Sequence, residues 1–88
     1  MPASLEKIRE ALGAASPFSE GEKFIIRWQF NDLDLLGDFE TGLIYAIKNA
    51  DEHNLDKLAL GFPVQVAAFR SWAHGNLGSC LRAWGLDI

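Results

Sequence analysis

Apolar side chains recur at helical spacing near the start of the chain. Leu5, Ile8 and Leu12 fall on one face of a helix with a period of about 3.6 residues. Ser4 is suited to cap this helix and Gly13 to end it. The pattern predicts a short amphipathic helix in this part of the chain.

A capping signal precedes the second apolar segment. Ser19 and Glu22 have the spacing of a capping box, in which each side chain accepts a hydrogen bond from the backbone amide of the other residue. The helix that begins there is expected to bury Phe24 and Trp28. Residues 24–30 are also compatible with a strand, because β-branched and aromatic side chains are frequent in strands. We favour a helix, since no other segment supplies a partner strand.

The clearest helical pattern lies between residues 38 and 50. Its apolar positions form one continuous stripe, made of Phe39, Gly42, Leu43, Ala46, Ile47 and Ala50. Asp38 is the expected N-cap. Glycine inside a helix costs about 1 kcal/mol relative to alanine. We therefore expect another helix to cross closely at Gly42 and to compensate for this cost.

Three more helices are predicted in the second half of the chain. Their start signals are, in order, Asn54 as an N-cap, Pro63 in the first turn and Asn76 as an N-cap, and their terminal glycines are Gly61, Gly75 and Gly85. The connections between them are brief. The sequence thus predicts a single all-α domain over residues 1–88, a compact bundle of five or six short helices.

Composition agrees with a small globular protein. The 88 residues are 49% hydrophobic and 23% charged, and an independent folding unit has roughly 50 to 250 residues. The one cysteine, Cys80, excludes an internal disulfide and fits a reducing compartment. Because Cys80 has helical spacing with Leu77 and Leu81, we expect it to be a small core residue.

Acidic residues are concentrated in the middle of the chain. The net charge is −4, and residues 32–56 hold seven carboxylates against one base, Lys48. These carboxylates are Asp32, Asp34, Asp38, Glu40, Asp51, Glu52 and Asp56. Such a segment repels phosphate backbones, so direct DNA or RNA binding is disfavoured. A third hypothesis is weak nucleic-acid binding through Lys57, Arg70 and Arg82. We expect that a binding assay would detect no such binding.

The sequence predicts a protein without a membrane segment. The longest uncharged run, residues 58–69, has 12 residues, whereas a helix across a bilayer needs about 20 apolar residues. Residues 1–10 become charged at once and lack the apolar stretch of a signal peptide. We therefore expect a cytoplasmic protein.

The chain offers no complete motif for catalysis or metal binding. Asp32 and Asp34 resemble the start of a calcium loop, but leucines occupy two of the later ligand positions. His53, His74 and Cys80 are too few for a structural zinc site, which needs about four ligands. No nucleotide-binding glycine pattern or nucleophile elbow is present. We therefore expect no cofactor, no metal and no enzymatic activity.

The aromatic residues indicate a binding surface. The chain contains six Phe, three Trp and one Tyr, and most of them are expected in the core. A small core does not enclose all of the larger rings, and exposed rings beside carboxylates are typical of protein-binding surfaces. The candidate residues are Trp28, Phe30, Tyr45, Trp72 and Trp84, with Asp32, Asp34 and Glu40 nearby.

One part of the chain resembles a known group of proteins. Residues 37–43, together with Asp51, Asn54, Leu55 and residues 58–63, are similar to small uncharacterised helical proteins of bacteriophages and prophages. The similarity lies in the order of helix caps and apolar positions. It implies a phage or mobile-element origin and no active site. Such proteins frequently act by occupying a surface of a host or phage protein, as anti-CRISPR and antirestriction proteins do.

These observations lead to two hypotheses. The first is a non-enzymatic interaction protein that binds and inhibits or modulates another protein, such as a nucleic-acid-processing complex of a bacterial host. The acidic segment would speed encounter with a basic partner, and the aromatic residues would supply affinity. The alternative is a self-associating structural or accessory protein of a phage or mobile element, with a homodimer as its simplest form.

Overall fold

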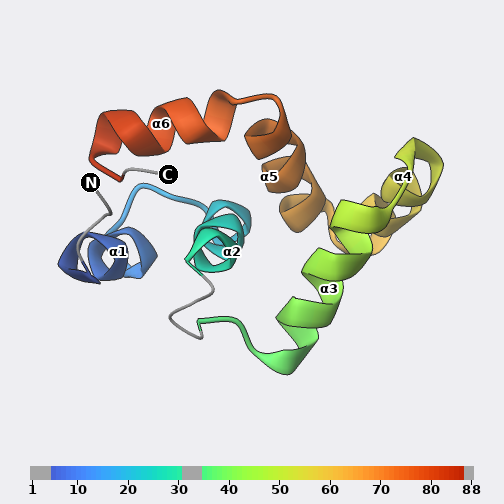
Figure 1. Cartoon of the computed structure of the whole chain (residues 1–88), viewed down its shortest axis with the longest axis horizontal. Coiled ribbons are helices and arrows are strands. Elements are labelled where there is room, and N and C mark those ends of the chain that lie inside the picture. Colours follow the sequence, from blue (N-terminus) through green and yellow to red (C-terminus); the bar gives the residue numbers. More distant parts are fainter. Residues whose placement is uncertain (1–4, 31–34, 87–88) are drawn as a thin grey trace.

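The chain folds into helices joined by short connections. The structure is a computed structural model and describes residues 5–30 and 35–86. These residues form six helices and no strand (Figure 1). The helices are α1 (Leu5–Leu12), α2 (Glu20–Gln29), α3 (Asp38–Asn49), α4 (Glu52–Gly61), α5 (Pro63–Ala73) and α6 (Asn76–Trp84). The predicted all-α architecture is confirmed. The expected cap Ser4 and the residues Asp32 and Asp34 lie outside the described ranges.

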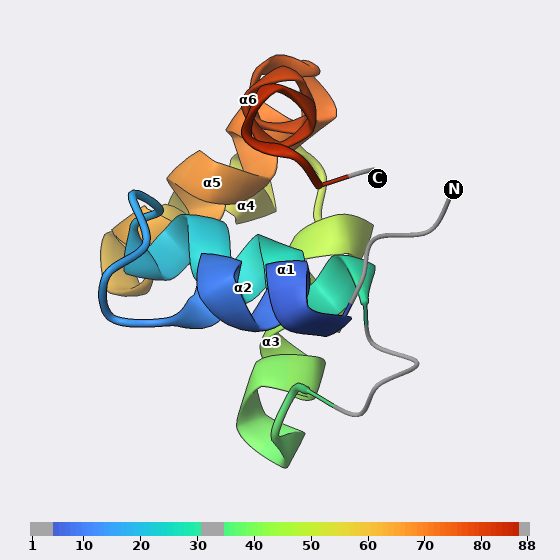
Figure 2. The same cartoon turned by 90° about the vertical axis from the view of Figure 1, so that its left-hand side faces the viewer.

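Helices α2 and α5 form the centre of the molecule. Helix α2 packs against α1 and α5 and touches α3, whereas α5 also packs against α4 and α6. Along the longest axis, of 36 Å, α1 and α6 lie at one end and α3 and α4 at the other (Figure 1). Figure 2, a view along this axis, shows α1 in front of α2 with α6 above them. The two ends of the molecule are therefore joined through α2 and α5.

The core is built around α2. Its consecutive residues Phe24, Ile25 and Ile26 are all buried, which requires neighbours on more than one side of the helix. The other buried apolar residues are Ile8, Ala11, Phe18, Leu36, Leu43, Ile44, Ile47, Leu55, Val66, Ala68, Leu77, Leu81 and Leu86. Residues 24–29 belong to helix α2, so the helix that we favoured over a strand for this segment is confirmed. Leu5, which the sequence pattern placed on the buried face of α1, is exposed.

A close helix crossing lies at Gly21 and not at Gly42. A Cβ atom added at Gly21 would lie 2.7 Å from Cγ1 of Val64 and would overlap the Val64 carbonyl oxygen. The missing side chain therefore lets α2 and α5 approach each other. A Cβ atom added at Gly42 would meet no described atom within 4 Å. The crossing expected at Gly42 is wrong.

The buried face of α3 overlaps the predicted stripe only in part. Leu43 and Ile47 of this stripe are buried as predicted, whereas its members Phe39, Gly42 and Ala46 are exposed and Ile44, outside the stripe, is buried. The prediction of Asp38 as N-cap is also wrong, because Gly37 is the N-cap and Asp38 is the first residue of α3. At this position Asp38 still lies favourably at the positive end of the helix dipole.

Two of the predicted helix starts are confirmed. In the capping box of α2, Ser19 Oγ accepts a hydrogen bond from the Glu22 amide at 3.2 Å. In return, Glu22 Oε1 accepts one from the Ser19 amide at 2.8 Å. Pro63 is the first residue of α5. Proline suits this position because its ring fixes φ and it has no amide to leave unsatisfied.

The two predicted asparagine caps are wrong. Asp51 caps α4 instead of Asn54, and its carboxylate accepts a hydrogen bond from the Asn54 amide at 2.8 Å. Asn76 is the first residue of α6, and Gly75 precedes it as the N-cap. Gly75 adopts a left-handed conformation with φ of 84°, which turns the chain between α5 and α6.

The last helix ends in a motif that buries Leu86. Gly85 has φ of 118° and its amide donates a hydrogen bond to the Arg82 carbonyl, while the Leu86 amide donates one to the Leu81 carbonyl. This Schellman motif places Leu86 against Leu81 in the core. Cys80 is exposed on the outer side of α6, so its prediction as a core residue is wrong.

Candidate protein-binding surface

The aromatic residues expected in the binding surface do not gather in one place. Trp28 of α2 and Trp72 of α5 pack edge to face, with ring centroids 4.7 Å apart. Phe69 lies against both, at 6.2 Å from Trp28 and 5.7 Å from Trp72. All three side chains are half-buried and pack against the core. Trp28 and Trp72 therefore stabilise the contact between α2 and α5.

Trp84 lies at the other end of the fold, on α6. Its ring packs against Phe18 with centroids 5.3 Å apart, and Lys7 Nζ lies 4.3 Å from its ring centroid. The second contact is a cation–π interaction between α1 and α6. Phe30, at the C-cap of α2, is half-buried against the core. Both Trp84 and Phe30 thus contribute to packing.

Among the carboxylates expected in the surface, the structure describes Glu40. Its Oε2 accepts a hydrogen bond from Arg27 Nη2 at 2.6 Å, and the Glu40 and Arg27 side chains are 32% and 21% exposed. This ion pair holds α3 against α2. Glu40 is consequently engaged within the chain rather than presented to a partner, while Asp32 and Asp34 lie outside the described residues.

The described part of the acidic segment does not form one bare face. Glu52 and Asp56 of α4 accept hydrogen bonds from Arg70 Nη2 of α5, at 3.1 Å and 2.7 Å. The hydrogen bond to Asp56 is the main reason why the pKa of Arg70 lies above its ordinary value. Together with Glu40, three carboxylates of this segment are therefore paired with arginine.

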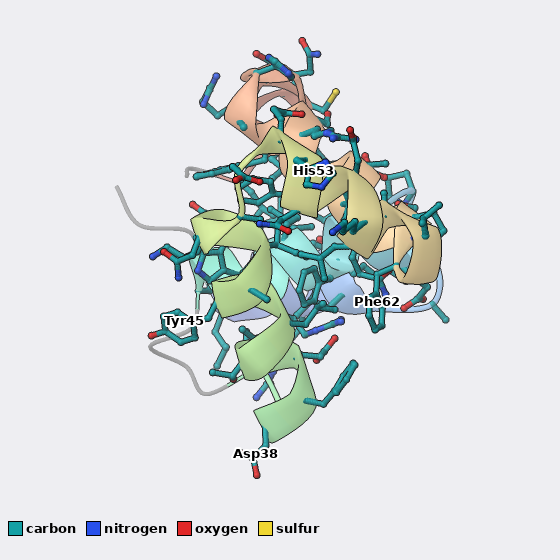
Figure 3. All side chains as sticks on the ribbon, turned by 90° about the vertical axis from the view of Figure 1, so that its right-hand side faces the viewer. Asp38, Tyr45, His53 and Phe62 are labelled. Carbon is teal, nitrogen blue, oxygen red and sulfur yellow. The ribbon has the colours of Figure 1, made fainter. Side chains whose placement is uncertain are left out.

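Tyr45 is exposed, as the hypothesis requires. Its side chain is 57% exposed and lies on the outer side of α3 (Figure 3). Lys48 Nζ lies 5.6 Å from its ring centroid, and Asn49 Nδ2 donates a hydrogen bond to the Tyr45 carbonyl at 2.9 Å. The ring therefore has polar neighbours on its own helix and an open side toward solvent.

An aromatic pair that the sequence did not reveal joins exposed Phe39 of α3 to half-buried Phe62. Phe39 is 67% exposed, and its ring centroid is 5.8 Å from that of Phe62, which connects α4 to α5. Figure 3 shows Tyr45 and Phe62 on opposite sides of α3, so the Phe39–Phe62 pair is separate from Tyr45. Helical periodicity placed Phe39 in the core. No signal in a single sequence marks such a stripe position as exposed.

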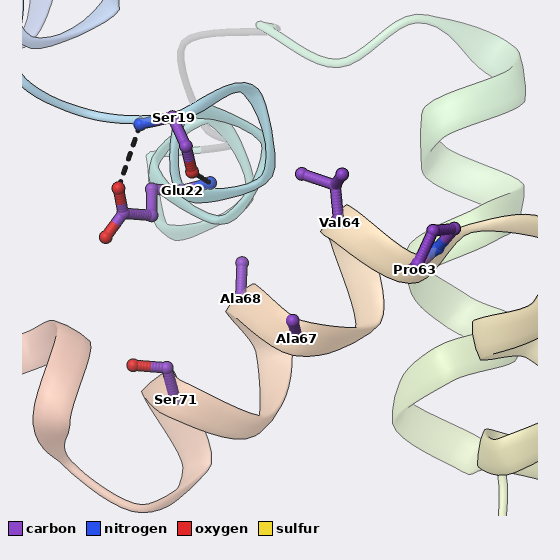
Figure 4. Close-up of a pocket in the computed structure, with 7 residues that line it drawn as sticks. All are labelled: Ser19, Glu22, Pro63, Val64, Ala67, Ala68 and Ser71. Carbon is purple, nitrogen blue, oxygen red and sulfur yellow. Dashed lines mark hydrogen bonds between the residues drawn. The ribbon is translucent and has the colours of Figure 1, made fainter.

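A shallow groove begins at Pro63, the residue that follows Phe62, and runs along α5 (Figure 4). Its volume is about 460 Å³, and its lining residues are Ser19, the N-cap of α2, Glu22 of α2, and Pro63, Val64, Ala67, Ala68 and Ser71 of α5. Ser19 and Glu22 are held by the capping box, so their polar groups are already hydrogen-bonded. The groove therefore offers mainly apolar contact with small side chains.

The side chains with metal-binding or nucleophilic chemistry do not form a site. In residues 5–30 and 35–86, no three His, Cys, Asp or Glu side chains are close enough together to hold a metal ion. His53 lies on α4, His74 follows α5, and Cys80 is on α6. Across the same residues, no helix has the length and apolar character needed to cross a lipid bilayer.

Comparisons with known proteins add no assignment. No protein-family model matches the chain, and no curated protein or solved structure matches it either. The function must therefore be argued from the surface itself.

Proposed function

We propose that the chain is a non-enzymatic interaction protein that binds another protein through the Phe39–Phe62 pair and the adjoining groove of α5. The exposure of Phe39 is the observation that carries the proposal. A phenyl ring that is 67% exposed gains hydrophobic free energy when a partner removes it from water. Aromatic side chains are enriched at the centre of protein interfaces, where they supply much of the affinity.

The surroundings of Phe39 suit a protein partner. Phe62 supports the Phe39 ring, so less side-chain entropy is lost when a partner binds. Exposed Val64 begins the groove beside this pair, and Leu60 is exposed at the end of α4. The small side chains that line the groove let a helix or an extended segment of the partner approach closely.

The proposed partner is a bacterial host or phage protein, in keeping with the resemblance of residues 37–63 to phage-encoded helical proteins. Binding would inhibit or modulate that protein by covering its surface, as anti-CRISPR or antirestriction proteins do. A net charge of −4 favours a basic partner, such as a nucleic-acid-processing complex. Because Arg27 and Arg70 pair with three carboxylates, we expect the salt dependence of binding to be modest.

Affinity capture with matched variants tests this proposal. The wild-type chain and the variants Phe39→Ser and Leu5→Ser are immobilised, and proteins retained from bacterial lysate are quantified by mass spectrometry. Leu5 is the matched control, because it is also exposed, at 49%, but lies on α1 at the far end of the molecule. We expect a protein that the wild type and Leu5→Ser retain and that Phe39→Ser retains at least about tenfold less.

Circular dichroism establishes that both variants are folded before capture. If Phe39→Ser retains every protein that the wild type retains, and in equal amounts, the Phe39–Phe62 pair is not the binding surface.

A second candidate function is that of a self-associating structural or accessory protein. The face of α3 that carries Gly42 and Tyr45 favours it, because no described part of the chain covers this face. Sedimentation over a concentration series distinguishes this function from binding to a different protein.

A further inference from the structure

The outer face of α3 has the features of a self-complementary helix surface. We define this face by Asp38, Gly42, Tyr45, Lys48 and Asn49, all of which are exposed. Helix α3 lies at one end of the long axis, away from α1 and α6 (Figure 1), and Tyr45 projects from its side while Asp38 projects from its first turn (Figure 3). A second molecule can therefore reach this face without meeting α1 or α6.

Gly42 leaves a gap in the middle of this face. A Cβ atom at this position would meet no described atom within 4 Å. Tyr45, three residues along the helix, carries a large exposed ring beside the gap, whereas the Phe39 ring lies against Phe62. Glycine is unfavourable inside a helix, and no described part of the chain makes use of the space above it. The gap is therefore open to a side chain of a second molecule.

Antiparallel pairing of two α3 helices fills the gap with Tyr45. Residues 38, 42, 45 and 49 are three or four positions apart and so share one face of the helix. When two such faces meet about a twofold axis midway between positions 42 and 45, Tyr45 of each copy lies over Gly42 of the other. The contact is reciprocal, as a twofold interface requires.

Charge selects the antiparallel orientation. Helix α3 has Asp38 in its first turn and Lys48 in its last turn. Antiparallel pairing brings Asp38 of one copy near Lys48 of the other and sets the two helix dipoles in opposite directions. Parallel pairing would instead place like charges side by side at both ends of the interface.

We propose that the chain forms a weak antiparallel homodimer through the outer face of α3, with Tyr45 of each copy seated over Gly42 of the other. Helix α3 has 12 residues and is therefore about 18 Å long. The interface is small, and we expect a Kd between about 10 µM and 1 mM. The dimer rests on the second candidate function and assigns its self-association to one face of α3, while Phe62 lies on the other side of this helix (Figure 3).

Sedimentation velocity between about 10 µM and 1 mM tests the dimer, with Gly42→Gln as the main variant. Glutamine favours helix more than glycine and has open space here, so the variant folds while its side chain occupies the gap. We expect the wild type to shift from 9.7 kDa to twice this mass. The Kd of Gly42→Gln and of Tyr45→Ala should rise at least about tenfold, whereas Leu60→Ala, a control on α4, should leave it unchanged.

Charge reversal tests the orientation. Asp38→Lys and Lys48→Asp should each weaken the dimer, and the double variant should restore it, because these positions meet in the antiparallel arrangement. A wild type that stays monomeric throughout the series, an unchanged Kd of Gly42→Gln, or association that Leu60→Ala abolishes would each overturn the proposal. Capture with Phe39→Ser is a separate readout, so the failure of one proposal is distinguished from the failure of the other.

Discussion

Two glycines inside helices have opposite surroundings, and the same substitution should affect them in opposite directions. Gly21 faces the Val64 carbonyl across the crossing of α2 and α5, whereas Gly42 faces open space. Gly21→Ala is expected to lower the free energy of unfolding by about 1–3 kcal/mol, because the backbone of α5 would have to move. Gly42→Ala is expected to raise it by about 0.5–1 kcal/mol, because alanine is the better helix former.

Urea denaturation followed by circular dichroism measures both effects, at a protein concentration too low for dimerisation. Wild-type stability in Gly21→Ala would mean that α2 and α5 are farther apart than the structure shows. A loss of stability in Gly42→Ala would mean that another part of the chain contacts this glycine.

The ion pair between Arg27 and Glu40 should matter more for stability than the one between Arg70 and Glu52. Both partners of the first pair are at least two-thirds buried, and Arg27 Nε is buried with no hydrogen-bond partner in the described part of the chain. We expect Glu40→Gln to lower the free energy of unfolding by about 1–2 kcal/mol, since a hydrogen bond to a charged group is lost.

Glu52→Gln is the matched control for Glu40→Gln. Glu52 is 83% exposed, and exposed ion pairs contribute little, so we expect a change below about 0.5 kcal/mol. The measurement is again urea denaturation. Equal effects of the two substitutions would show that the Arg27–Glu40 pair does not hold α3 in place.

At the scale of whole helices, the start of a helix was predictable where only one residue of the segment suits the first position. Pro63 could start α5 because proline is excluded from a helix interior. The start of α4 was not predictable, because Asp51 and Asn54 are both good caps and lie three residues apart. With Asp51 as the N-cap, α4 begins at Glu52 and is longer than it would be with Asn54 as the cap. In this arrangement the Asp51 carboxylate accepts a hydrogen bond from the Asn54 amide.

The buried face of α3 was not predictable, because this helix is apolar on two sides. Leu43 and Ile47 can share a buried face either with Phe39 and Ala46 or with Ile44, because both sets fit helical spacing. Contacts from outside the helix decide between them. The bond from Arg27 fixes Glu40 toward α2, and this rotation buries Ile44 and exposes Phe39.

The competition between the two possible caps of α4 gives a prediction for this helix. Asp51→Ala removes the side-chain acceptor of the Asn54 amide and should lower the free energy of unfolding by about 1 kcal/mol. Asn54→Ala should change it by less than about 0.5 kcal/mol, because Asn54 is an exposed position inside the helix. Thermal denaturation of both variants checks the assignment, and the reverse order of effects would move the start of α4 to Asn54.

Across the whole molecule, the aromatic residues divide into those that join helices and those that stay exposed. Of the five candidate rings, Tyr45 is exposed, whereas Trp28, Trp72 and Trp84 lie in ring contacts between elements. A large aromatic ring can either pack between two helices or stay exposed to solvent. Which of the two occurs depends on which helices lie next to it. That information belongs to the three-dimensional arrangement and has no local signal in the sequence.

The same arrangement predicts that stability is uneven along the molecule. Helix α2 buries Phe24, Ile25 and Ile26 and packs against α1 and α5, whereas Leu55 is the buried residue of α4. Because α4 opens with little loss of buried apolar surface, we expect its amides to exchange with solvent at least about tenfold faster than those of α2. Hydrogen exchange measured by mass spectrometry at low protein concentration checks this. Equal protection of α2 and α4, at the level of global unfolding, would show instead that the six helices open together as one cooperative unit.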